Sequence, residues 1–145
     1  MASYRHLART CVMQTIFNIE FHDQDPRETL DIVLDEFAPK LTEKEFAYQT
    51  LDGVLDKKDD ILQIISKFAP EWPIEKIAKI DRAILEIGVY EIVFSSEVPP
   101  VVAINEAVEI AKEYGDHSSP KFINGVLSNV MKKYHEELPK TGGTD

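Results

Sequence analysis

Three basic residues near the N-terminus are the first candidates for contact with phosphate: Arg5, His6 and Arg9. Arg5 and Arg9 are four residues apart, so on a helix both would project from one face. Both arginine side chains are expected to be exposed, and exposed arginines of this kind are able to contact phosphate groups. The alternative is an ordinary solvated helix face.

A second candidate site lies where the last predicted helix begins, at Lys121 and Phe122. The free N–H groups and positive dipole end of a helix start could meet a phosphate, and Ser118 adds a hydroxyl. The Phe122 ring could stack on an unpaired base, as aromatic side chains do for single-stranded RNA. It could equally be core, because it begins the apolar stripe at positions 122, 126 and 130.

Enzyme chemistry finds little support. The four histidines are scattered, and none pairs with Cys11 or with another histidine at the spacing of metal ligands. The only double glycine, at 142–143, precedes no helix and so forms no phosphate loop. Cys11 falls in an apolar-periodic segment and is predicted to be a small core residue. We therefore expect no catalysis, no metal and no cofactor.

Composition favours one domain in the cytoplasm. The 145 residues are 43% hydrophobic and 29% charged, and no apolar run approaches the roughly 20 residues that span a bilayer. The N-terminus lacks a secretory signal, and a single cysteine excludes an intrachain disulfide. The net charge of −10 repels nucleic acid at long range. An RNA site would therefore be a local basic patch, or one completed by a basic partner.

Apolar residues recur at helical spacing between Pro and Gly boundaries, which predicts an all-α protein. A capping-box pattern at 42–45 predicts one helix start. The segment at 80–94 is apolar nearly all round and is predicted to be the central helix, with Gly88 marking a close approach of two helices. The predicted helices span about 3–21, 26–37, 42–55, 61–68, 80–94, 101–114 and 121–134.

Several strings of residues occur together along the chain. They are Ala8-Arg9 with Cys11, Gln14 and Phe17; Trp72-Pro73; Ile80 to Leu85 with Tyr90-Glu91; Ala103 to Lys112; and Lys121 to Leu127. In order and separation these strings resemble the NusB family of bacterial RNA-binding transcription antitermination factors. The resemblance implies an all-α, NusB-like helical bundle of about seven helices in two packed subdomains. It implies one RNA-binding domain over 1–138, followed by a disordered tail at 139–145.

The resemblance also implies a function. Family members bind the boxA element of ribosomal RNA leaders together with ribosomal protein NusE, and the pair helps load an antitermination complex on RNA polymerase. By resemblance, five residues lie near the protein partner: Phe17, Asp81, Arg82, Glu86 and Glu91. Asp81 is the first candidate for the acidic side of that contact. The alternative assigns Phe17 to the core and the charges to solvated helix surface.

The sequence departs from the family pattern where RNA would bind. The arginine-rich segment of the first helix is thin, and Ser118 stands where an acidic residue is common. A rival interpretation is therefore a protein-interaction scaffold without RNA affinity. An accessory domain of an RNA methyltransferase is disfavoured, since little chain follows the last helix. Self-association in the absence of the partner stays open. Asn105 and Asn124 are interpreted as structural amides.

Overall fold

The computed structural model describes residues 2–69 and 71–136, and within them it is entirely helical. The expected tail at 139–145 lies outside these residues. Three short turns, η1 (Ile74–Lys76), η2 (Tyr90–Phe94) and η3 (Lys132–Glu136), accompany seven α-helices. The α-helices are α1 (Ala2–Phe21), α2 (Pro26–Phe37), α3 (Glu45–Asp56), α4 (Lys58–Phe68), α5 (Lys79–Val89), α6 (Pro100–Tyr114) and α7 (Ser119–Met131).

The helix starts follow local chemistry in one case and not in another. Asp25 caps α2, since its carboxylate accepts a hydrogen bond from the Glu28 N–H at 2.9 Å, and Pro26 fits the first turn. The capping box predicted at 42–45 is wrong. Helix α3 begins at Glu45 after Lys44, which makes no side-chain capping bond.

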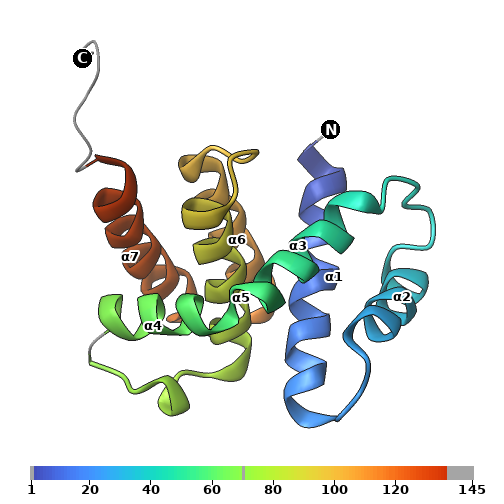
Figure 1. Cartoon of the computed structure of the whole chain (residues 1–145), viewed down its shortest axis with the longest axis horizontal. Coiled ribbons are helices and arrows are strands. Elements are labelled where there is room, and N and C mark those ends of the chain that lie inside the picture. The colour runs from blue at the N-terminus through green and yellow to red at the C-terminus, as the bar shows by residue number, and fades with distance from the viewer. Residues whose placement is uncertain (1, 70, 137–145) are drawn as a thin grey trace.

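The helices form two packed groups, as the family resemblance implied. Helices α1, α2 and α3 contact one another on one side, and α4 to α7 contact one another on the other. Figure 1 shows α3 and α4 following each other across the molecule, with only Lys57 between them. Helix α5 packs against α1 and joins the two groups.

Helix α5 is the predicted central helix, and every residue from Asp81 to Val89 is buried. A Cβ added at Gly88 would lie 2.6 Å from the Leu127 side chain of α7, which confirms the close approach of two helices there. The predicted helix at 80–94 is α-helical only to Val89, and the chain continues as the π turn η2.

Cys11 confirms its assignment to the core. Its side chain is fully buried in α1, and burial raises the pKa of the thiol to about 11. The thiol therefore stays protonated at neutral pH and acts as a small apolar side chain.

Candidate nucleic-acid interface

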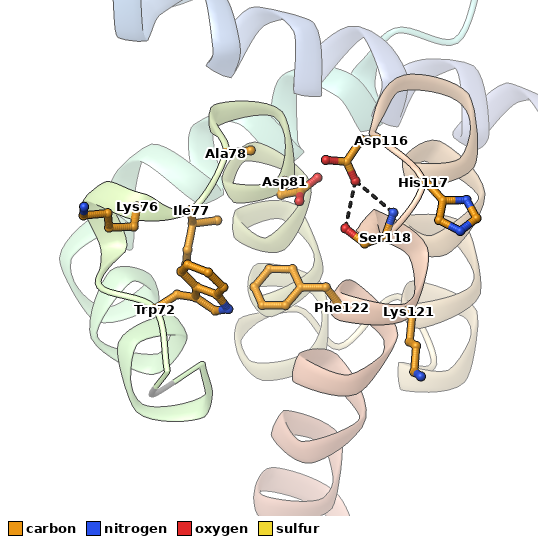
Figure 2. Close-up of a pocket in the computed structure, with 10 residues that line it drawn as sticks. All are labelled: Trp72, Lys76, Ile77, Ala78, Asp81, Asp116, His117, Ser118, Lys121 and Phe122. Carbon is orange, nitrogen blue, oxygen red and sulfur yellow. Dashed lines mark hydrogen bonds between the residues drawn. The ribbon is translucent and has the colours of Figure 1, made fainter.

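A cavity of about 600 Å³ opens where α5 and α7 begin. Figure 2 shows the residues that line it, which come from the corner before η1, from η1, from the start of α5 and from the start of α7. They are Trp72, Lys76, Ile77, Ala78, Asp81, Asp116, His117, Ser118, Lys121 and Phe122. Three predicted RNA-binding residues, Ser118, Lys121 and Phe122, therefore lie together.

Two aromatic rings face each other across this cavity. The side chain of Phe122 points toward Trp72 (Figure 2). Trp72 is 52% exposed, although burial is the common state for so large a ring. Phe122 is half-buried, packs against the core and also lines the cavity, so it meets the geometry of both alternatives. From the sequence, Trp72 contributed only to the Trp72-Pro73 string and was not predicted as a site residue.

Hydrogen bonds around Asp116 fix the start of α7. Its carboxylate accepts from the Ser118 N–H and the Ser118 hydroxyl, both at 2.9 Å (Figure 2), and these bonds lower the pKa of Asp116. The Ser119 hydroxyl accepts from the Asp116 N–H at 3.0 Å. Two lysines at the cavity, Lys76 and Lys121, are exposed, and His117 also lines it.

Asp81 lies at this cavity and is only 8% exposed. Its Oδ1 atom is buried without a hydrogen-bond partner among the described residues. Burial raises the pKa of this carboxyl against the opposing effect of the Ser119 hydroxyl, and the nearby charge of Asp116 raises it further. A buried acceptor without a donor is costly, so this oxygen is suited to an N–H or O–H group of a ligand.

The basic cluster of α1 differs from its prediction. Arg5 is exposed, with Nη2 3.9 Å from Glu97 Oε1 and its guanidinium 4.4 Å above the Phe46 ring. The expected exposure of Arg9 is wrong, because the residue is 3% exposed and its Nε lies 3.0 Å from both oxygens of Glu91. A buried carboxylate that needs a counterion turns this arginine inward.

His6 is also bound within the chain. Its Nδ1 lies 2.8 Å from Glu106 Oε1 and its Nε2 lies 3.3 Å from Glu113 Oε1, both on α6. Burial would lower the pKa of His6, but the two carboxylates outweigh it and the pKa is raised. His6 therefore ties the start of α1 to α6. Glu106 was missed as its partner because a contact a hundred residues away leaves no local signal in the sequence.

The charged residues predicted near the partner are not on the surface. Glu86 is fully buried, with Lys58 Nζ 2.9 Å from its Oε1, and burial raises its pKa against the opposing effect of Lys58. Arg82 pairs with Glu20 and is 8% exposed. Glu91 is 1% exposed beneath Arg9. These charges are buried, so the alternative that they form solvated helix surface is wrong, and their place near a protein partner stays a prediction.

Phe17 lies in a second cavity, of about 420 Å³, between α1 and α2. Its ring packs edge-on against Phe21 at 4.9 Å, and the buried Gln14 Oε1 has no hydrogen-bond partner among the described residues. Ile32 and Phe37 stand 59% and 56% exposed at the same cavity. Its lining comprises Met13, Gln14, Phe17, Asn18, Gln24, Thr29, Ile32, Val33, Glu36, Phe37, Ile80 and Tyr114.

The described residues offer neither a metal site nor a membrane-spanning helix. They hold no group of three or more His, Cys, Asp or Glu side chains placed to bind a metal. Within the same residues, no helix has the length and apolar character needed to cross a membrane. Asn105 and Asn124 are both exposed, which does not support their interpretation as structural amides that satisfy neighbouring polar groups.

The described residues form an all-α bundle of seven α-helices with an open cavity lined by two aromatic rings and two lysines. The NusB family model matches residues 6–132, and the chain belongs to the NusB family. The transcription antitermination protein NusB of Bacillus pumilus is 41% identical over 92% of this chain and 98% of its own length. The Bacillus subtilis protein of that name is 39% identical over 87% of this chain and 93% of its own length.

Solved structures agree with this assignment. A structure of T. maritima NusB superposes with a TM-score of 0.81 at 34% identity, covering 90% of this chain and 92% of that chain. A structure of antitermination factors NusB and NusE in complex with dsRNA has a TM-score of 0.83 at 28% identity, covering 92% of this chain and 100% of that chain.

Proposed function

We propose that this chain is a non-catalytic transcription antitermination factor of the bacterial cytoplasm. It binds single-stranded, boxA-type RNA of ribosomal RNA leaders together with NusE, and the pair joins an antitermination complex on RNA polymerase. Residues 1–138 act as one domain. The observation that carries the proposal is the cavity in which Trp72 and Phe122 face each other beside exposed lysines.

Each part of the cavity has a role in this proposal. A base stacks on Trp72 or enters between its ring and that of Phe122, an arrangement that accepts any base by its π face. The unpaired Asp81 Oδ1 accepts a hydrogen bond from an exocyclic amine of that base. Lys121 meets the neighbouring phosphate as a point charge. Ser118, whose hydroxyl already donates to Asp116, acts through its remaining acceptor capacity.

The cavity beside Phe17 is the proposed docking surface for NusE. Exposed apolar side chains that surround a cavity, with a buried acceptor in its wall, are typical of a protein contact site. Helix α2 also carries Asp31, Asp35 and Glu36 at exposed positions, which suit a basic partner. Ile80 lines this cavity and Asp81 lines the RNA cavity, so the two proposed sites adjoin on α5.

The net charge of −10 makes the two ligands interdependent. Alone, the acidic chain attracts few phosphates, whereas the same surface steers a basic NusE toward it. The complex then presents more positive charge to RNA. We expect coupling of about 1–3 kcal/mol between NusE and RNA, equal in both directions.

Filter binding with boxA-like and scrambled single-stranded RNA, each with and without saturating NusE, tests this function. We expect tighter binding of the boxA-like RNA and a further gain of about 5- to 150-fold with NusE. An Ile32→Lys/Phe37→Lys variant should lose the gain from NusE while keeping the RNA affinity of the isolated chain. No RNA binding in either condition, with NusE still bound, would favour the rival scaffold function.

A further inference from the structure

The exposed face of α7 continues from the RNA cavity and has an unusual charge pattern. Residues 117–135 contain no acidic residue, in a chain with 26 of them. Lys121, Asn124, Gly125 and Lys132 are exposed, and Ser128 between them is half-buried. These positions recur at helical spacing, so they form one stripe, called here the α7 stripe.

The lysines at the two ends of the α7 stripe carry charge that the described part of the chain does not neutralise. No carboxylate of a described residue lies within ion-pair distance of Lys121 or Lys132, whereas the arginines of α1 and α5 each contact at least one. The two lysines are separated by about 16 Å along the helix at about 1.5 Å per residue. That length has room for at least two phosphates of one strand.

Gly125, in the middle of the α7 stripe, supplies an independent observation. A glycine inside a helix weakens it relative to alanine, so its presence calls for a reason. At Gly53 and Gly88 the reason is close packing, because an added Cβ would lie 2.2 Å from Tyr90 and 2.6 Å from Leu127. At Gly125 an added Cβ would meet nothing within 4 Å. No described residue lies close enough to require the glycine, and a closely approaching second molecule would.

We propose that the α7 stripe is a second contact surface for RNA, over which the sugar-phosphate backbone runs after leaving the cavity. Figure 2 shows Phe122 directed toward Trp72, while Lys121, which also lines the cavity, extends in a different direction, so consecutive residues address a base and the continuing backbone. Lys121 and Lys132 contact phosphates, Asn124 and Ser128 donate hydrogen bonds, and Gly125 lets the backbone approach the helix. This inference rests on the proposed RNA-binding function.

The test measures binding of boxA-like single-stranded RNA, with saturating NusE, by three variants of the α7 stripe: Lys132→Gln, Ser128→Glu and Gly125→Leu. Matched controls on the exposed face of α4 are Lys67→Gln and Ser66→Glu. At about 0.1 M salt, loss of one phosphate contact should weaken binding about fivefold, since each contact contributes about 0.7 to the salt slope for single strands. The α4 controls should bind as the parent does.

Gly125→Leu separates a binding role from a structural one. Leucine favours a helix more than glycine, so the melting temperature should stay level or rise while RNA affinity falls about fivefold or more. A fall in melting temperature with unchanged affinity would overturn the inference.

Two further results would overturn the inference in different ways. If Trp72→Ala weakens RNA binding and the α7 variants bind as tightly as the parent, the α7 stripe is not a contact while the proposed function stands. If the α7 variants lose NusE binding instead, the stripe is a protein surface. Absence of RNA binding by the parent chain with NusE would remove the proposed function itself.

Discussion

Helices α1 and α7 each begin with basic residues in a stretch free of acidic ones, residues 1–19 and 117–135, yet their surroundings are opposite. In α1, Arg5, His6 and Arg9 all contact carboxylates from later parts of the chain. In α7, Lys121 contacts none among the described residues. A basic cluster in sequence is thus no measure of available positive charge, because folding can bring counterions to it.

The basic residues of the two helices therefore have different roles. The charges of α1 hold the bundle together, since they bridge α1 to η2 and α6. The charges of α7 remain available to a ligand beside an exposed aromatic ring. Substitutions in α1 should therefore lower stability, whereas substitutions at exposed positions of α7 should lower RNA affinity.

The largest effect is expected for Arg9→Gln. The change leaves the Glu91 carboxylate buried without its counterion, which should lower the free energy of unfolding by about 3–5 kcal/mol. Lys121→Gln, on the exposed face of α7, should change it by less than about 0.5 kcal/mol. Urea unfolding followed by circular dichroism measures both.

A double variant controls this prediction. Replacing both partners, Arg9→Met with Glu91→Leu, removes the unpaired charge and should recover most of the lost stability. If Arg9→Gln alone unfolds like the parent, the pair is not structural and the contrast between α1 and α7 fails.

Trp72→Ala is expected to act on binding alone. The ring is half exposed, so the melting temperature should barely change, while loss of base stacking should weaken RNA binding by about 1–3 kcal/mol. Trp72→Phe keeps an aromatic face and is the matched control. Phe122→Ala should lose both affinity and stability, because that ring packs on the core as well. Parent-like RNA affinity in Trp72→Ala would remove the cavity from the RNA site.

The smallest effect concerns His6 and depends on pH. Because its pKa is raised in the folded state, its contribution is complete below the unfolded value of about 6.5 and is lost as pH rises through the folded pKa. Near pH 6 the free energy of unfolding of the parent should exceed that of His6→Gln by about 0.5–1 kcal/mol, and this difference should decrease at higher pH. His22→Gln, at an exposed position, is the control. A gap independent of pH would show that charge is not involved.

The helices could be predicted from sequence because their signals are local. Each signal acts within a few residues of the chain. Examples are Pro26 after Asp25, the apolar periodicity, and the polar residues around Lys57 where α3 ends and α4 begins. The bounds predicted for the first two helices agree with α1 and α2 to within a residue. Gly88 predicted a close helix approach because a helical glycine has few other uses.

The site was predicted only in part, because burial depends on distant contacts. Ser118, Lys121 and Phe122 are close in sequence and lie at one cavity. The inward direction of Arg9 depends on Glu91, which is 82 residues away, and that of Glu86 on Lys58. The place of Trp72 opposite Phe122 likewise depends on the packing of α5 and α7, and no local pattern encodes it.

The salt dependence of RNA affinity tests the central claim most directly, that α7 rather than α1 supplies the cation that RNA meets. The measurement uses boxA-like single-stranded RNA and saturating NusE, with the parent, Lys121→Gln and Arg5→Gln compared between about 0.05 and 0.2 M salt. We predict that Lys121→Gln lowers the salt slope by about 0.7, the value for one phosphate contact, and that Arg5→Gln lowers it less, since Glu97 and Phe46 already engage Arg5. The account would be contradicted if Lys121→Gln left the salt slope unchanged while Arg5→Gln lowered it by about 0.7.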